Sequence, residues 1–332
     1  MAAFPLQIIK RAKKLLILRP GPYVLISLAL PLLLIVVLFI GVQRSFLVEA
    51  ETGYLSLRFE GENAWSLPKA TLCSPLAIPN RTAEPVAGEA CSPFDQKPSG
   101  LRNVVIEWRE GDTVGLRAER VETGDRVRII FPPAPAPETG PAPKFAGSDL
   151  VIPSEIWADA GALLFSGQAT IGRVIGRNER YYLHHADWEA RQTVFFGSLL
   201  GLSAERVMSG TALRGSELEV TRREATLPGL PPDIVPATVF GHITPADGDG
   251  PLAAVSVTML SEPGRTALRL NNFGLSDPIT IRPGFMDLAA NSILLLAAFT
   301  IITLAASVTQ FVGDLRSLGR REDGNDPHGS DS

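Results

Sequence analysis

The sequence predicts a membrane-anchored, mainly β protein in which two transmembrane helices flank an extracytoplasmic, β-rich and sandwich-like region. Three observations support this fold class. Two uncharged apolar runs lie near the ends of the 332-residue chain, at residues 23–42 and 288–312. Between them, short segments alternate polar and apolar residues with the period of a β-strand. The 27 prolines and 30 glycines, with only 7% aromatic residues, favour many short elements joined by turns.

A basic amino-terminal segment, residues 1–22, precedes the first predicted span at residues 23–42. The span has no charged residue, and a helix of twenty residues is about 30 Å long, which matches the hydrocarbon core of a bilayer. Pro31 lies in its middle and predicts a bend, because proline removes one backbone donor. A cleaved secretory signal is the alternative, but the apolar core of such signals is usually about 7–15 residues long.

The second span is expected at residues 285–312, most of which carry no charge and which are long enough to cross a bilayer with some tilt. Small and hydroxylated residues let membrane helices approach and hydrogen-bond, so we expect this helix to pack against its mate or another protein. The candidate packing residues are Asn291, Ser292, Thr300, Thr303 and Ser307. Hydrogen bonds from the hydroxyl groups to their own helix backbone explain these residues equally well.

Basic residues beside the spans predict the orientation. Five of them precede the first span, and the positive-inside rule places them in the cytoplasm: Lys10, Arg11, Lys13, Lys14 and Arg19. Three arginines follow the second span on the same side, and the polar residues 313–332 after it are predicted to be a disordered cytoplasmic tail. We therefore expect a protein of the bacterial inner (plasma) membrane with both termini in the cytoplasm and its central region in the periplasm.

The two cysteines, Cys73 and Cys91, both lie in the region predicted to be periplasmic. An oxidising compartment favours a disulfide between them, and closing a loop of this length contributes about 3 kcal/mol in the chain-entropy model. A redox or metal-binding pair is the alternative. It lacks the Cys-x-x-Cys spacing and a nearby histidine.

A first β-subdomain is expected at residues 43–131. Residues 54–59 alternate as in a half-buried strand. Three further strands separated by turn sequences predict a meander, at residues 104–108, 114–120 and 127–131. Residues 132–147 then contain six prolines, which preclude a sheet interior and predict a semi-rigid linker at a subdomain boundary.

A second, larger β-subdomain is expected at residues 148–284. Its predicted strands lie at residues 162–173, 180–196, 216–222, 237–243, 252–259 and 266–270. Residues 246–250 are acidic and glycine-rich, which is typical of a hairpin turn. An EF-hand would need a longer acidic series and a terminal glutamate.

The most site-like cluster is His184, His185, Asp187 and Glu189. On a strand, His185, Asp187 and Glu189 would share one face, and His184 would lie on the other. A metal site needs three or four ligands that converge, and residues two apart on one strand diverge unless a neighbouring strand completes the set. We therefore interpret the cluster as a polar strand and expect no metal and no other cofactor.

Other chemistry has no sequence support. Ser198 does not lie in the G-x-S-x-G pattern of a nucleophile elbow, and no phosphate-binding glycine loop is present. The formal net charge of −4 does not indicate nucleic-acid binding.

Three hypotheses for the function remain. The leading one is a non-enzymatic envelope protein whose periplasmic β-region binds or scaffolds partners, with membrane lipid and a membrane or periplasmic protein, or a second copy of the chain, as its contacts. The second is an accessory factor in surface-polysaccharide assembly or export, because a large domain between two spans resembles the topology of chain-length regulators. Only the topology is shared, since those proteins are helical and strands predominate here. The third is an envelope enzyme that uses the cluster from His184 to Glu189.

Overall fold

The computed structural model describes residues 43–79, 89–92, 94–99, 103–133, 145–173, 181–193, 205–224, 233–246 and 252–284, and six single residues in helical conformation after residue 286. Residues Gln43–Thr193 and Ala204–Gly284 belong to one compact unit. Within the described ranges this unit is built almost entirely from antiparallel strands, with a single short helix. The predicted mainly β fold is confirmed.

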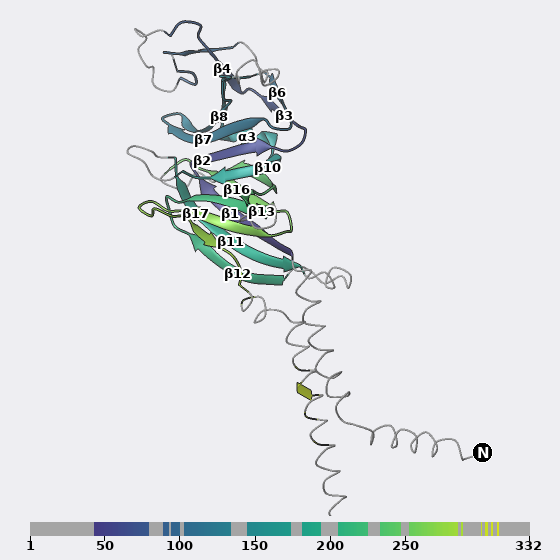
Figure 1. Ribbon diagram of the computed structural model, residues 1–332. Coiled ribbons are helices and arrows are strands. Elements are labelled where there is room, and N and C mark those ends of the chain that lie inside the picture. Colours follow the sequence, from purple (N-terminus) through teal and green to yellow (C-terminus); the bar gives the residue numbers. More distant parts are fainter. Residues whose placement is uncertain are drawn as a thin grey trace, which may run out of the picture. The chain divides into compact units, whose positions relative to one another are not determined.

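The first part of the unit contributes nine strands, and Figure 1 labels most of them. These are β1 (Gln43–Thr52), β2 (Tyr54–Phe59), β3 (Asn63–Pro68), β4 (Thr71–Pro75), β5 (Gln96–Pro98), β6 (Asn103–Trp108), β7 (Thr113–Val121), β8 (Gly124–Ile130) and β9 (Asp149–Pro153).

The second part contributes the helix and nine more strands. These are α3 (Ser154–Ala160), β10 (Leu163–Ile171), β11 (Leu183–Thr193), β12 (Glu205–Ala212), β13 (Glu217–Glu224), β14 (Asp233–Pro236), β15 (Val239–Pro245), β16 (Val255–Ser261), β17 (Thr266–Asn271) and β18 (Ile279–Ile281).

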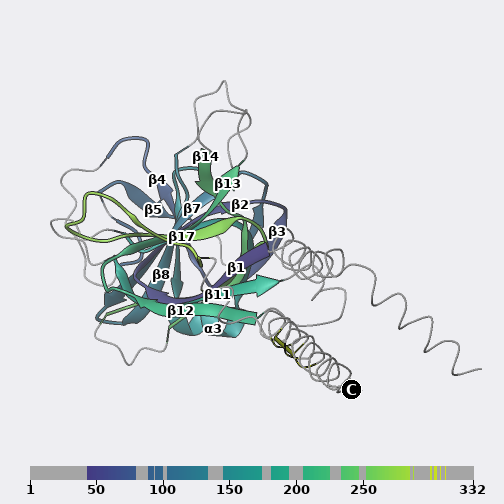
Figure 2. The same ribbon diagram turned by 60° about the horizontal axis from the view of Figure 1, so that its bottom comes forward.

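Sixteen of these strands form one sheet. Twelve pair side by side in the order β12-β11-β1-β16-β15-β10-β2-β7-β8-β9-β4-β5, and the other four branch from β10 through β13. Only Gly53 separates β1 from β2 in the chain, yet β16, β15 and β10 lie between them in the sheet. The sheet therefore curls, and Figure 2 shows its strands arranged around a common interior.

The interior of the curled sheet is apolar because each strand turns every second residue inward. In β2, Leu55, Leu57 and Phe59 are buried, whereas Arg58 is exposed, as the sequence predicts. Aromatic rings fill much of the core. Phe59 stacks on Trp108 with ring centroids 4.5 Å apart.

Helix α3 covers part of this core with one fully buried side chain, Trp157. The helix starts after Pro153, whose ψ of 140° is extended, and it ends before Gly161, whose φ of 84° favours glycine. The Trp157 ring meets the edge of Trp65 from β3, with centroids 4.7 Å apart.

The predicted three-stranded meander was wrong at its first strand. Strands β7 and β8 form the expected hairpin, but β6 pairs with β3 in a separate two-stranded sheet. The turn before β7 explains the difference. Gly111 donates to the carbonyl of Phe59, and Phe59 donates to that of Asp112, so β7 is held beside β2 instead of β6.

The Pro-rich residues 132–147 do not divide the sheet into two parts. The Gly147 amide donates to the carbonyl of Pro132 at 3.0 Å, so the two ends of the segment meet. Strands β8 and β9 on either side pair directly, and β2 pairs with β10 across the expected boundary. The described ends of the segment therefore meet between two strands that pair directly. Residues 134–144 lie outside the described ranges.

The first predicted span, the basic segment before it and the cytoplasmic tail lie outside the described residues. Within residues 285–312, the few described residues are helical, and the Ser307 hydroxyl donates to the Thr303 carbonyl at 2.9 Å. No helix in the described ranges combines the length and the apolar character needed to cross a bilayer. The anchoring of the chain by two spans stays a prediction.

Candidate binding site

The predicted disulfide is present. It holds the loop that contains Cys91, directly before β5, over the outward face of the sheet. Cys73 in β4 and Cys91 are joined with their Cα atoms 5.3 Å apart. Both cysteines pack against Val151 of β9 and against Ala90, in an apolar cluster separate from the main core. The residues around Cys91 are thereby held above β8 and β9.

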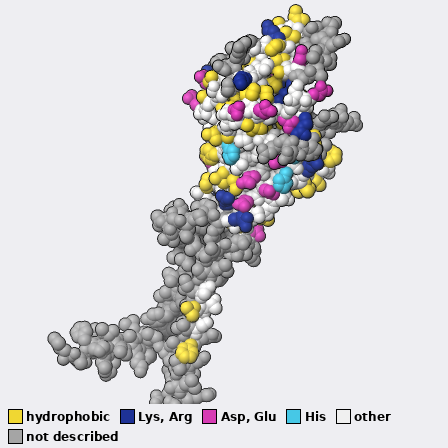
Figure 3. All heavy atoms as spheres, turned by 180° about the vertical axis from the view of Figure 1, so that it is seen from behind, with side chains coloured by type: hydrophobic (Ala, Val, Ile, Leu, Met, Phe, Trp, Pro, Cys, Tyr) yellow, Lys and Arg dark blue, Asp and Glu magenta, His cyan; other side chains and the backbone are white. Residues whose placement is uncertain are grey.

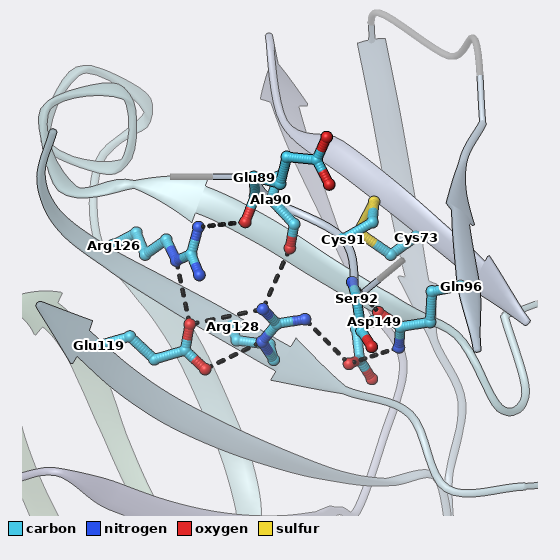
Figure 4. Close-up of polar contacts among 10 residues, drawn as sticks. All are labelled: Cys73, Glu89, Ala90, Cys91, Ser92, Gln96, Glu119, Arg126, Arg128 and Asp149. Carbon is cyan, nitrogen blue, oxygen red and sulfur yellow. Dashed lines mark hydrogen bonds and ion pairs between the residues drawn. A yellow bond between two sulfur atoms is a disulfide. The ribbon is translucent and has the colours of Figure 1, made fainter. Parts of the chain in front are cut away.

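A network of charged side chains lies beneath this loop (Figure 4). The carboxylate of Glu119 in β7 accepts from Arg126 Nε and from Arg128 Nε, both at 3.0 Å. Arg128 Nη1 also donates to Asp149 at 3.1 Å, and the same carboxylate accepts from the Gln96 amide at 2.8 Å. Four strands and the loop are therefore linked through charge-assisted hydrogen bonds.

The two arginines of the network also bind the loop backbone. Arg126 Nη1 donates to the carbonyl of Glu89 at 2.9 Å, and Arg128 Nη2 donates to that of Ala90 at 3.0 Å (Figure 4). The arginines thus hold the loop on one side of Cys91 while the disulfide holds it at Cys91 itself.

The charges of this network are stable at neutral pH. Burial favours the neutral form of Glu119, but hydrogen bonds and attraction from Arg128 and Arg126 outweigh burial and lower its pKa. Burial likewise disfavours the charged form of Arg128, yet Glu119 and Asp149 raise its pKa. Each partner stabilises the charge of the other, and we interpret the network as structural.

An open cavity of about 430 Å³ lies between the loop and the sheet. The network residues form much of its floor, and Ser92, Phe94 and Asp95 of the loop line its wall. Arg117 of β7 also lines it. Its Nε atom is buried and has no hydrogen-bond partner in the described part of the chain.

Arg117 belongs to a larger group that we call the arginine–tyrosine surface, defined by Tyr54, Arg117, Arg173, Tyr181, Tyr182 and Arg214. Each arginine of this group lies over a tyrosine ring, and Tyr181 and Tyr182 are adjacent in the chain. Arg117 lies 4.3 Å above the centre of the Tyr181 ring, and it pairs across the sheet with Tyr54. Gly115 leaves room for the Tyr54 ring, since a Cβ there would lie 3.2 Å from the Tyr54 hydroxyl.

The two outer arginines lie on tyrosine rings in the same way. The Arg173 guanidinium lies 4.0 Å from the centre of the Tyr54 ring and donates to its hydroxyl at 2.9 Å. The Arg214 guanidinium lies 5.2 Å from the Tyr182 ring centre and donates to its hydroxyl at 2.8 Å. These contacts orient three guanidinium groups without neutralising them. Among the described residues, none of the three forms an ion pair with a carboxylate.

The predicted polar cluster lies in β11, where His185 and Asp187 point outward. His185 Nε2 is 3.1 Å from Asp187 Oδ2, and both side chains are more than half exposed. Glu189 instead pairs with Arg191 and Arg206, each at 3.2 Å, and hydrogen bonds from Arg191 and then Arg206 lower its pKa. Figure 3 shows acidic, basic and histidine side chains intermingled on one face of the described region.

His184 lies apart from this cluster. The pairing of β1 with β11 shifts register beside it, and its ring is half-buried next to Tyr182, with centroids 5.3 Å apart. Burial and then the charge of Arg214 lower its pKa, so the ring is neutral at pH 7. Across the described ranges, no three His, Cys, Asp or Glu side chains are placed to hold a metal ion. A functional role for the cluster stays a prediction.

The arginine–tyrosine surface was missed at the level of sequence. Its residues come from five separate segments, and only the adjacent Tyr181 and Tyr182 stand out in the chain. Strand register, not spacing, brings Tyr54 and Arg117 together.

Comparison with known proteins finds no matching family model, no matching curated protein and no matching solved structure.

Proposed function

We propose that the chain is a non-enzymatic protein of the bacterial inner membrane, anchored by residues 23–42 and 285–312, whose periplasmic β-region binds an acidic protein partner. The arginine–tyrosine surface is the observation that supports this proposal most directly. It presents three guanidinium groups that form no ion pair with a carboxylate among the described residues, and one of them, that of Arg117, lines an open cavity.

The chemistry of this surface suits a carboxylate-bearing partner. Arginine binds carboxylates through two parallel hydrogen bonds, and arginine and tyrosine are both enriched where protein interfaces concentrate their binding energy. Arg173 and Arg214 are exposed, and the tyrosine rings hold them in place before a partner arrives. Less conformational entropy is then lost on binding.

The anchoring part of the proposal is supported by the ends of the β unit. Strand β1 begins at Gln43, directly after the first apolar run, and the unit ends at Gly284, directly before the second. The disulfide between Cys73 and Cys91 fits an oxidising compartment outside the cytoplasm.

An accessory role in surface-polysaccharide assembly or export is the second candidate. Arginines can bind sugar carboxylates or phosphates, and tyrosine rings can pack against sugar rings, so the same surface would suit an anionic glycan. A deletion strain whose surface glycan keeps its normal amount and length would argue against this role.

Site-specific crosslinking in intact cells tests the proposed binding. A photoreactive phenylalanine analogue replaces Leu213, an exposed neighbour of Arg214 outside the arginine–tyrosine surface, in the full chain, and crosslinked products are identified by mass spectrometry. We expect one reproducible protein partner whose yield falls about tenfold when Arg173→Gln and Arg214→Gln are combined. The matched control combines Arg58→Gln in β2 and Arg109→Gln directly after β6, two exposed arginines that form no ion pair with a carboxylate in the described ranges. A chain that gives no reproducible crosslink, or equal losses in both double variants, would contradict the proposal.

A further inference from the structure

Four arginines gather at the end of the β unit where the chain enters and leaves it. We call this group the arginine collar, and its members are Arg44, Arg223, Arg265 and Arg282. Arg44 lies near the start of β1, and Arg282 directly follows β18. They come from four different segments of the sequence.

Backbone contacts bring the collar together. The amide of Arg44 donates to the carbonyl of Gly264 at 2.9 Å, and the amide of Gly264 donates back at 2.8 Å. Arg265 is the next residue, and its carbonyl accepts from the amide of Arg223 at 3.4 Å. Arg282 follows Ile281, which pairs with Leu268 of β17, and β17 pairs on its other side with β13, the strand that contains Arg223.

The charges of the collar are not neutralised within the described part of the chain. None of its four arginines forms an ion pair there, and Glu224, the nearest acidic residue in sequence to Arg223, is engaged by Arg222 at 2.8 Å. The Nε atoms of Arg44 and Arg282 are buried and have no hydrogen-bond partners among the described residues. Burial lowers the pKa of Arg44, and burial followed by repulsion from Arg223 and Arg44 lowers that of Arg282.

Like charges held close together, with unused buried donors, favour the binding of an anion. The position of the collar in the sequence indicates which anion. Arg44 is the second residue after the first predicted span, and Arg282 stands three residues before the second. If the proposed anchoring holds, both arginines lie at headgroup depth. They lie on the periplasmic side, where the positive-inside rule favours fewer basic residues.

We propose that the arginine collar binds the phosphate of an anionic phospholipid headgroup in the outer leaflet of the inner membrane. This inference rests on the anchoring in the proposed function. Guanidinium groups bind phosphate oxygens through paired hydrogen bonds, and an anionic membrane surface attracts each nearby basic residue. The bound phosphate would relieve the repulsion among the four arginines and use the buried donors of Arg44 and Arg282.

Native mass spectrometry of the full chain tests the inference. The protein is released from nanodiscs that contain equal amounts of phosphatidylglycerol and phosphatidylcholine, and the retained lipids are counted. We expect the wild-type chain to retain phosphatidylglycerol in preference to phosphatidylcholine. In the variant that combines Arg44→Gln and Arg282→Gln, this preference should fall by about fivefold for each arginine removed. The control pair Arg58→Gln and Arg109→Gln should keep the preference. Arg44→Lys with Arg282→Lys should keep part of it, because charge remains while paired hydrogen bonding is lost.

Three outcomes separate the possible failures. If alkaline carbonate releases the full chain from membranes, the proposed anchoring fails, and the inference fails with it. If the chain stays in the membrane but retains both lipids equally, or if the control pair loses the preference as well, only the collar inference is overturned. If millimolar glycerol phosphate binds the wild-type chain and abolishes its lipid preference, the collar is a site for soluble phosphate esters and the lipid assignment is overturned.

Discussion

At the scale of single residues, close approach of backbones decides which side chains the sheet accepts. Gly167 in β10 lies opposite Phe59 of β2 and Val239 of β15, at the centre of the curled sheet. Its φ is 154°, and a Cβ there would collide with the backbone carbonyl of Arg58. Glycine is required at this position for steric reasons that the sequence pattern does not reveal.

Gly167→Ala should therefore destabilise the β unit by about 3 kcal/mol, because backbone atoms must shift to admit the methyl group. Unfolding in urea can be followed by tryptophan fluorescence, because all four tryptophans are buried, three of them in strands and one in helix α3. Gly264→Ala is the control, because a Cβ at Gly264 has no atom within 4 Å. Equal urea midpoints for Gly167→Ala and Gly264→Ala would show that the close approach of the Arg58 carbonyl does not restrict position 167 to glycine.

The Glu119 network predicts a pH dependence. The pKa of Glu119 is lowered in the folded protein, so its contribution to stability is complete above the ordinary value of 4.5 and is lost as the pH falls through the lowered folded pKa. Glu119→Gln should lower the free energy of unfolding by about 2 kcal/mol at pH 7.

The difference between wild type and Glu119→Gln should shrink as the pH falls below 4.5. Chemical unfolding at a series of pH values measures it. Glu107→Gln is a control, because this exposed carboxylate of β6 forms no ion pair in the described ranges. A difference that is the same at every pH would contradict the role assigned to the network.

At the scale of elements, alternation of apolar residues predicted most strands of the second half and the β7–β8 hairpin. Strand β1 falls within the predicted first β-subdomain but was not predicted as a strand, because its apolar residues follow the first apolar run directly. Strands β3 and β4 were not predicted either. Both are short, and Lys69, which lies between them, has a positive φ of 62°. Pairing was harder to predict than strand location, because the choice of partner depends on turn hydrogen bonds such as those between Phe59 and Asp112.

The loop that carries Cys91 depends on both the disulfide and the arginine network. Replacing both cysteines, Cys73→Ala with Cys91→Ala, should lower stability by about 3 kcal/mol and expose the loop to proteases. Limited proteolysis followed by mass spectrometry should find new cleavage between residues 89 and 98. Wild type treated with a reductant is the parallel experiment. Unchanged cleavage in both would show that Arg126 and Arg128 suffice to hold the loop.

At the scale of the whole molecule, the sequence predicted the β-rich region and its disulfide but neither of the two arginine-rich groups proposed as binding sites. The candidate cluster in β11 was visible because its residues are adjacent in the chain. The arginine–tyrosine surface and the arginine collar were not visible, because each combines residues from segments that only the curled sheet brings together. The candidate site that sequence could find is thus mostly an exposed strand face with local ion pairs.

We propose that two spans hold the β-region on the periplasmic side of the membrane, and labelling of single cysteines in intact spheroplasts is a direct test. Phe273→Cys places a thiol at a site that is 69% exposed in the β unit, and Ser330→Cys places one in the carboxyl-terminal tail. A membrane-impermeant maleimide should label Phe273→Cys in intact spheroplasts and Ser330→Cys only after permeabilisation. Labelling of Ser330→Cys in intact spheroplasts, or protection of Phe273→Cys until lysis, would contradict the claim.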